Sequence, residues 1–291
     1  MAVQRATAYQ CAHKLLRVPV KSAPAILMPL FMYAAFGGAL GAVGETKGFG
    51  YYSYTAFVFV SVVFMAGTFS AVFTAFDVAS DYETGFAHRL MLAAPRRLAI
   101  VGGYVTVSIW RCLVSVAVVF AVALATGLSV RGSALEIVGL LALVVLVNVV
   151  TMLYGTGIAL RFQTTASSVL ILIPAFMLFF LSPIFIPRHQ LSGWLRSATD
   201  VNPLTPVLEA GRGFLAGEPT KVALAFIAIG GLLILFILWV IAGMRKAERG
   251  PAESRGPRAR GPRGRRAQAE GGGGPPARGP RRRGPRARAP A

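Results

Sequence analysis

Six long apolar stretches, separated by short polar segments, restrict the fold of this chain more than any other feature. The hydrocarbon core of a bilayer is about 30 Å thick, and a helix needs roughly 20 apolar residues to cross it. Backbone amides within lipid must be hydrogen-bonded inside their own segment, and the stretches lack the alternation of barrel strands, so we expect helices. We therefore predict an all-α membrane protein with six transmembrane helices, at about residues 25–43, 54–76, 98–128, 134–160, 165–187 and 221–244.

The composition agrees with this prediction, and the basic residues orient the helices. Hydrophobic residues make up 55% of the 291 residues, charged residues only 14%, and the mean hydropathy is +0.62. Lys and Arg gather on the cytoplasmic side of membrane proteins, and residues 245–291 hold 15 of the 30 in this chain. With six spans, we expect a multi-pass protein of the inner (plasma) membrane with both termini in the cytoplasm. Residues 2–21 mix apolar and basic side chains, which is typical of an amphipathic helix on the inner leaflet.

The carboxyl-terminal tail is built from Gly, Pro, Arg and Ala and cannot form a core. Residues 245–291 carry 15 basic and 3 acidic residues, a net charge of +12 out of the +19 of the whole chain. The overall charge therefore does not indicate a specific nucleic-acid partner. We predict a transmembrane domain over residues 1–245 and a disordered cytoplasmic tail over residues 246–291. Attraction of the tail to anionic lipid headgroups or to nucleic acid is the alternative to a solvated extension without a partner.

The motifs of several function classes are missing from the sequence. No Gly-x-x-x-x-Gly-Lys-Ser/Thr loop occurs, so we expect the chain to bind no ATP itself. The three histidines fall in different loops, so neither a metal site nor a catalytic group is expected. Glu136, near the start of the fourth, is the one acidic residue within the six predicted spans, which disfavours a transporter driven by an ion gradient. The sequence thus predicts that the chain is neither an enzyme nor a cofactor-binding protein. It also predicts that the energy for transport comes from outside the chain.

A polar island follows the second apolar stretch. Asp77, Asp81 and Glu83 come first, and Arg89, Arg96 and Arg97 come last. Acidic residues at the start of a helix and basic residues at its end complement the helix macrodipole, and Pro95 would end such a helix. Phe86, Leu90 and Met91 would form an apolar stripe on it. We therefore predict a short amphipathic helix at the cytoplasmic face.

The spacing within this island resembles the cytoplasmic-loop signature of the type-2 ATP-binding-cassette (ABC) export permeases. In that family, the loop forms a coupling helix that inserts into a groove on a separate ATPase subunit. The resemblance implies this role for Asp81, Glu83, Gly85, Phe86, His88, Arg89, Leu90, Pro95 and Arg97. His88 departs from the pattern, since many relatives carry a glutamate at its position.

A second resemblance to the same permeases lies between the fifth and sixth stretches. Residues 188–220 are too apolar for a loop in water and too interrupted by proline to cross a bilayer, so we expect them to fold back into the bundle. Glu209 and Arg212 are expected to pair on one helix face. In the family, re-entrant outer helices close the export path here. The resemblance implies an outer gate made of Pro183, Pro187, Trp194, Asn202, Pro203, Glu209 and Arg212.

Four residues inside the apolar stretches are candidates for a translocation path. Arg111 either lines a path or pairs across a dimer, or else it reaches the interface or a backbone carbonyl. Asn148 shares a helix face with Thr151 and Tyr154, for which interhelical hydrogen bonds are the commoner role. Phe176 and Phe180 would suit a flat hydrophobic cargo, although such rings more often face lipid or neighbouring helices.

Together, the resemblance implies the permease subunit of an ABC exporter, in which two permease chains work with two copies of a separate ATPase that uses ATP and Mg. The short loops look most like daunorubicin-resistance-type drug exporters, so the expected cargo is a hydrophobic drug, antibiotic or lipid-like molecule. Export of a lipid-linked glycan or polysaccharide by the same machinery is one alternative. A non-transporting membrane sensor or assembly protein that acts through its basic tail is another, and a secondary transporter is a third.

Overall fold

The structure, a computed structural model, describes residues 19–39, 49–87, 89 and 97–249. The chain divides into two compact units, Met1–Glu248 and Arg249–Ala291, and the described helices belong to the first, apart from the last residue of α10. The predicted amino-terminal amphipathic helix and the predicted disordered tail lie outside the described residues. The elements are α2 (Pro19–Ala39), α3 (Tyr54–Glu83), α5 (Arg97–Ala125), α6 (Ala134–Phe162), η2 (Thr165–Ser167), α7 (Ser168–Phe180), η3 (Arg188–Gln190), α8 (Gly193–Val201), α9 (Leu204–Ala216) and α10 (Val222–Arg249).

The helical class is confirmed, because the described residues form helices and turns without a strand. Four helices are long and apolar enough to cross a bilayer: α3, α5, α6 and α10. The first and fifth predicted spans correspond to shorter apolar helices, over Ala23–Ala39 and Thr165–Phe180. α7 ends at Phe180 rather than at residue 187, because a residue before proline avoids the helical conformation and Pro183 follows closely.

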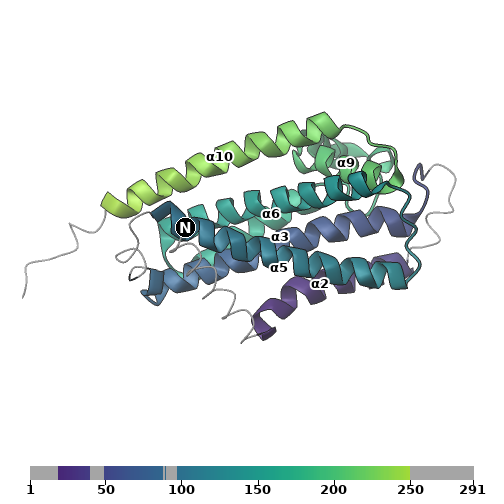
Figure 1. Cartoon of the computed structure of the whole chain (residues 1–291). Coiled ribbons are helices and arrows are strands. Elements are labelled where there is room, and N and C mark those ends of the chain that lie inside the picture. The colour runs from purple at the N-terminus through teal and green to yellow at the C-terminus, as the bar shows by residue number, and fades with distance from the viewer. Residues whose placement is uncertain (1–18, 40–48, 88, 90–96, 250–291) are drawn as a thin grey trace, which may run out of the picture. The chain divides into compact units, whose positions relative to one another are not determined.

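Helix α3 lies at the centre of the bundle. It contacts α2, α5, α6, α7 and α9, and 94% of its most apolar stretch is buried. Its sequence is apolar on every face, as expected for a helix surrounded by other helices. Helix α10 is its opposite, with only 17% of its apolar stretch buried, so most of its Leu, Ile and Phe side chains face outward. Figure 1 shows α10 along one side of the bundle and α2, α3, α5 and α6 side by side.

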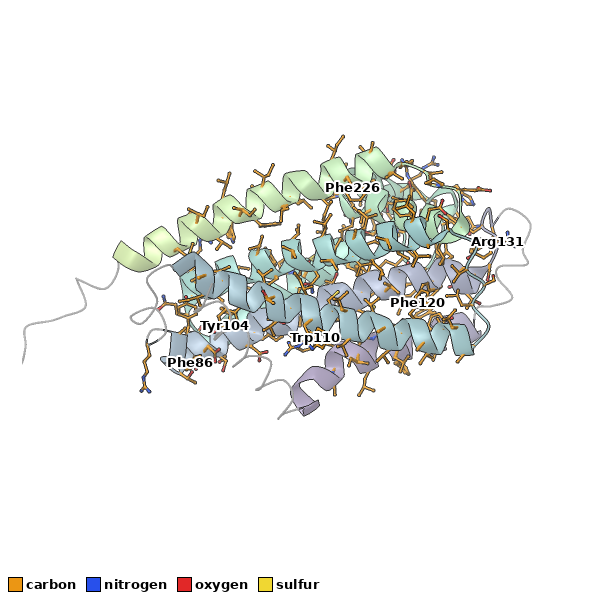
Figure 2. The ribbon with its side chains drawn as sticks, viewed as in Figure 1. Phe86, Tyr104, Trp110, Phe120, Arg131 and Phe226 are labelled. Carbon is orange, nitrogen blue, oxygen red and sulfur yellow. The ribbon has the colours of Figure 1, made fainter. Side chains whose placement is uncertain are left out.

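The connections between helices gather at two ends of the bundle. At the Glu83 end, α3 and α6 finish and α5 and α7 begin, and the Glu83 carboxylate accepts a hydrogen bond from the Thr165 amide. At the α9 end, the Arg131 amide donates to the Leu215 carbonyl at 3.2 Å and the Tyr52 hydroxyl to the Ser129 carbonyl at 2.8 Å. In Figure 2, Phe86 and Tyr104 mark the first end and Arg131 marks the second.

Helix α3 extends seven residues beyond the predicted second span. Val78, Ala79 and Tyr82 continue its apolar face and pack with Ile100 and Tyr104 of α5, so the helix persists to Glu83. The chain turns at Gly85, whose φ of +73° is readily adopted only by glycine. The prediction that Asp81 and Glu83 begin a short helix is therefore wrong. They lie in the last turns of α3, where the helix macrodipole does not favour them.

Helix α10 is attached to α6 close to the Glu83 end. The guanidinium of Arg161 lies 3.6 Å from the centre of the Trp239 ring, and its Nη2 donates to the Trp239 carbonyl at 3.2 Å. Trp239 also fills the space above Gly157, where an added Cβ would lie 2.0 Å from the indole ring. Glycine at position 157 thus allows the tryptophan to approach the backbone of α6.

Candidate functional site

The irregular segment Leu181–Pro187 at the α9 end is mostly buried, apart from the exposed Ile186, although it forms no helix. Pro183 and Pro187 both interrupt it, and both are buried. Buried carbonyl groups need donors, and here side chains from other helices supply them. The Thr199 hydroxyl donates to the Leu181 carbonyl at 3.2 Å, and the Ser61 hydroxyl donates to the Ile184 carbonyl at 2.8 Å. The segment is therefore held by tertiary hydrogen bonds, as the irregular backbone of a folded-back element requires.

Arg212 of α9 is the principal donor to this segment. Its side chain is only 4% exposed, and its Nη2 donates to the Pro183 carbonyl at 2.6 Å and to the Ser61 hydroxyl at 2.8 Å. The guanidinium lies 3.6 Å from the centre of the Phe57 ring. Burial lowers the pKa of Arg212 to about 10, so the residue is still a cation at neutral pH. One buried cation thus joins α3, α9 and the irregular segment.

The prediction that Glu209 pairs with Arg212 is wrong, because each side chain binds a different partner. Glu209 forms an ion pair with Lys221 at 2.5 Å, while Arg212 points into the bundle toward Ser61 and the Pro183 carbonyl. Residues three apart on a helix can meet, but the carbonyls of a buried irregular segment bind the guanidinium instead. Local spacing could not reveal this competition.

Asn202 connects the fifth apolar helix to α9. Its Nδ2 donates to the Leu178 carbonyl at 2.6 Å, and its Oδ1 accepts the Leu204 amide at 2.9 Å, which caps the start of α9 beside Pro203. Trp194 of α8, in contrast, is 74% exposed. Of the predicted gate residues, Pro183 and Arg212 meet at the irregular segment, Asn202 bonds the last turn of α7 just before it, and Trp194 is exposed. Their role as a gate stays a prediction.

At the Glu83 end, two predicted coupling residues make structural contacts. Glu83 accepts a hydrogen bond from the Thr165 amide just before α7. A carboxylate at this position is also stabilised by the macrodipole of the helix that follows. Asp81 accepts the Tyr104 hydroxyl of α5 at 2.7 Å. These contacts tie the last turns of α3 to α5 and to the residues just before α7. Sequence reasoning missed both partners, because neither lies near the acidic residues in the chain.

The other predicted coupling residues surround the turn at Gly85. Phe86 is partly buried, residues 86, 87 and 89 are helical, and the Arg89 side chain is exposed. Arg97 begins α5. His88, Leu90 and Pro95 lie outside the described residues, so the full coupling helix stays a prediction. Among the described coupling residues, Arg89 is the exposed cation beside a turn that follows the anchored end of α3.

Arg111 lies in a polar cluster between α3 and α5. It is 3% exposed, and its Nη2 forms an ion pair with Asp77 at 3.0 Å while its Nη1 donates to the Thr74 hydroxyl at 3.1 Å. The partner is thus an acidic residue of the same chain, which none of the expected alternatives included. It was missed because Asp77 falls one residue past the predicted second span, whereas α3 continues to Glu83.

We expect the two members of this pair to respond differently to removal. Asp77→Ala leaves a buried guanidinium without its counter-ion and should lower the free energy of unfolding by about 2 kcal/mol or more. Arg111→Met removes the buried charge and leaves Asp77, which is 41% exposed and can reach water or headgroups, so a smaller loss is expected. Denaturant unfolding of the purified variants in one detergent checks this order. Equal losses, or a larger loss for Arg111→Met, would show that the buried charge is compensated by other groups.

Asn148 joins three helices. Its Nδ2 donates to the Gly67 carbonyl of α3 at 2.8 Å, and its Oδ1 accepts the Ser108 hydroxyl of α5 at 3.1 Å. The interhelical hydrogen bonds considered for this residue are confirmed. Tyr154 makes another, to the Leu170 carbonyl at 2.8 Å. That carbonyl lacks its usual helical donor because residue 174 is a proline without an N–H.

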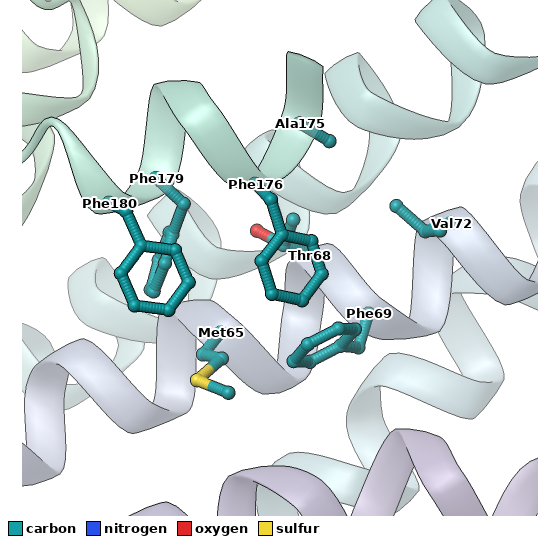
Figure 3. Close-up of a pocket in the computed structure, with 8 residues that line it drawn as sticks. All are labelled: Met65, Thr68, Phe69, Val72, Ala175, Phe176, Phe179 and Phe180. Atoms are coloured by element: carbon teal, nitrogen blue, oxygen red, sulfur yellow. The ribbon is translucent and has the colours of Figure 1, made fainter. Parts of the chain in front are cut away.

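Phe176 and Phe180 pack against α3. Their rings stack on each other with centroids 5.6 Å apart, and Phe176 meets Phe69 edge-on at 5.0 Å. Figure 3 shows both rings beside Met65 and Phe69. The cavity among them is about 10 Å³, near the smallest that can hold one water molecule. In this conformation the stripe is closed, and its role in translocation stays a prediction.

A larger apolar cavity lies between α6, α7 and α10. Its volume is about 240 Å³, and Thr151 and Tyr154 supply hydroxyl groups in a lining that is otherwise mostly apolar, with Leu178, Ile229 and Phe236. A cavity of this composition suits a hydrophobic ligand better than a charged one. Among the described residues, no group of three or more His, Cys, Asp or Glu side chains is placed to bind a metal ion.

Comparisons with known proteins agree with this arrangement. The sequence profile described as ABC-2 type transporter matches residues 5–215. The chain is 26% identical to the daunorubicin resistance ABC transporter permease protein DrrB1 of Streptomyces coeruleorubidus over 229 residues. This alignment covers 75% of this chain and 77% of that protein. The matched residues include both the Glu83 end and the segment that Arg212 holds.

Proposed function

Because the chain belongs to the ABC-2 type transporter family, we propose that it is the membrane-spanning permease of an exporter whose ATP is hydrolysed by a separate ABC subunit. Two copies of the permease, or this chain and a related one, would work with two ATPase subunits. In this arrangement all six apolar helices cross the inner membrane, and the Glu83 end faces the cytoplasm together with both termini. ATP and Mg belong to the ATPase.

The anchored turn at the Glu83 end is the observation that carries this proposal. A force applied to the turn after α3 reaches α5 through the Asp81–Tyr104 hydrogen bond and α7 through the Glu83–Thr165 hydrogen bond. α3 itself runs through the centre of the bundle to the α9 end. A push from a partner on the exposed Arg89 side would therefore move helices as a unit rather than deform a free loop.

At the α9 end, the segment held by Arg212 serves as the outer gate in this proposal. It would open when α3 moves, since Ser61 of α3 bonds both Arg212 and the Ile184 carbonyl. Pro183 and Pro187 keep this segment from forming a continuous helix, so it can change conformation without breaking helical hydrogen bonds. Outward release would then follow displacement of the segment from the bundle.

We further propose that the cargo is a hydrophobic drug, antibiotic or lipid-like molecule. The apolar cavity of about 240 Å³ between α6, α7 and α10 supports this class, as does the name of the relative in Streptomyces coeruleorubidus. A lipid-linked glycan would need a wider path for its polar sugars than this mostly apolar cavity offers. The cavity borders α10, whose outward face is apolar, so a membrane-dissolved cargo could enter from the lipid side.

Reconstitution tests the proposed function. The permease is placed in lipid vesicles with a candidate ABC ATPase partner, and the movement of a fluorescent anthracycline is followed after ATP is added to the side of the ATPase. We expect transport with ATP and Mg and none with a non-hydrolysable ATP analogue. Transport that follows an imposed ion gradient without the ATPase would instead identify a secondary transporter. If the permease binds the ATPase but transports none of the tested compounds, the proposed cargo class is wrong.

A further inference from the structure

A charged cavity at the α9 end is separate from the apolar cavity and from the candidate coupling segment. Its volume is about 540 Å³, and it lies between the residues that precede α3, the turn before α6, His189 of η3 and the second half of α9 with the residues that follow it. A second cavity of about 290 Å³ adjoins it and shares Tyr51, His189 and Glu209 in its lining. Together they offer room for a group larger than a single ion.

Basic residues outnumber acidic ones around both cavities. Five cations line them, of which Lys221 is paired with Glu209 and Arg188 with Asp200. Arg131 and Arg196 have no carboxylate partner among the described residues. Arg131 instead lies over the Tyr52 ring, 4.3 Å from its centre. Against these unpaired cations stands one unpaired acid, Glu218. The side chains that line the two cavities therefore carry a net positive charge.

Arg212 forms the inner wall of the larger cavity. Its Nη2 is used by the irregular segment, but its Nε and Nη1 are buried without a hydrogen-bond partner among the described residues. Buried donors without partners are rare in proteins, because each costs about 1–3 kcal/mol. Glu209 and Tyr51 interact electrostatically with this guanidinium, and an oxyanion in the cavity would add acceptors for its two remaining donors. Arg212 thus points to a ligand that is negative.

The cavity lies at the ends of the four candidate spans, where we expect lipid headgroups to meet the protein. The residues around it adjoin the starts of α3, α6 and α10 and the end of α5, which are the termini of the four candidate spans. Tyr51 and Tyr52 also lie in its lining, and tyrosine is enriched at the membrane–water interface. A phosphate at this depth can belong to a lipid or be dissolved in water.

We propose that this cavity binds a phosphate-bearing anion, held by Arg131, Arg196 and the inner guanidinium of Arg212. The anion is either the headgroup of an anionic lipid or a free phosphate compound. Bound there, it would lie against the segment that Arg212 holds and would stabilise the closed arrangement of the α9 end. The site is independent of the coupling proposal, because it uses residues at the opposite end of the bundle.

Two substitutions with opposite expected effects test the site in the full chain purified in a neutral detergent. Arg131→Gln removes an unpaired cation at the rim and should weaken binding about tenfold, the cost of one lost charged hydrogen bond. Glu218→Gln removes the unpaired acid and should strengthen binding about threefold. Both side chains lie at the margin of the fold, so both variants should melt at the wild-type temperature when no anion is present. Arg196→Gln repeats the first test on another element.

Two probes separate the sources of the phosphate. Native mass spectrometry counts the phosphatidylglycerol molecules retained, with phosphatidylcholine as the uncharged comparison. Thermal unfolding in sodium phosphate, compared with sodium chloride at equal ionic strength, measures binding of free phosphate. Loss of retained phosphatidylglycerol in the two arginine variants and a gain in Glu218→Gln support a lipid headgroup. The same order in the phosphate-dependent melting shift alone supports a soluble phosphate. If neither probe distinguishes the three variants from the wild type, the site does not exist.

Discussion

Arg212→Ala is expected to lower the free energy of unfolding by about 3 kcal/mol and to expose the segment Leu181–Pro187. The substitution leaves the Pro183 carbonyl without its donor and empties the space beside the Phe57 ring. Relief of the desolvation of the buried charge offsets part of this cost, but it cannot refill the space or supply a donor. Chemical denaturation measures the stability, and hydrogen exchange of residues 181–187 measures the exposure. Faster exchange there, and not elsewhere, is the expected pattern.

Arg212→Lys is the matched comparison for this variant. Lysine keeps the positive charge but cannot stack on Phe57 as a plane, nor donate to two acceptors in the same fixed geometry. We expect it to recover less than half of the lost stability. Full recovery would mean that charge alone holds the segment. A wild-type melting temperature for Arg212→Ala would contradict the role given to this residue.

Arg89→Glu is expected to reduce ATP-driven export at least tenfold while leaving the stability of the permease within about 0.5 kcal/mol of wild type. Arg89 is exposed, so reversing its charge removes no internal contact. The reversal does change the charge that this residue presents to any partner that docks there. The ATPase should continue to hydrolyse ATP without moving cargo. Export and hydrolysis measured in the same vesicles test this separation.

Arg89→Lys keeps the charge and should retain most of the export. Glu83 is a poorer choice for this test, because its carboxylate bonds the Thr165 amide, and its reversal would disturb the start of α7 as well as the partner. Wild-type export by Arg89→Glu would remove this segment from the coupling pathway. Loss of export together with loss of folded protein would be equally damaging, since it would make Arg89 a structural residue.

The helical class and the two polar regions could be predicted because they depend on local composition. Long apolar stretches specify helices in lipid, and Pro183 and Pro187 specify an interruption wherever the chain folds. The end of α3 could not be predicted in the same way. It depends on the packing of Tyr82 against α5, and the acidic residues at 77 and 81 suggested that the helix had already ended.

The partners of charged residues were the hardest feature to predict. Arg111 pairs with Asp77, 34 residues away, and Arg212 donates to Ser61, 151 residues away. Partners so far apart in the chain cannot be identified from the spacing of residues in the sequence. The i, i+3 rule named Glu209 for Arg212, but a buried backbone carbonyl competes for the guanidinium only once the fold has brought it there. The position of Arg111 deep in an apolar stretch did indicate that it needs a partner, although not which one.

Cysteine crosslinking shows whether the turn after α3 meets an ATPase at the cytoplasmic face. Cys11→Ser and Cys112→Ala remove the native thiols, and Arg89→Cys then supplies one thiol at the turn. We expect it to react with a membrane-impermeant maleimide in inverted vesicles but not in intact cells, and to crosslink to the co-expressed ABC ATPase in an ATP-dependent manner. Labelling of residue 89 from outside intact cells, or its failure to crosslink while the complex still exports, would contradict the account.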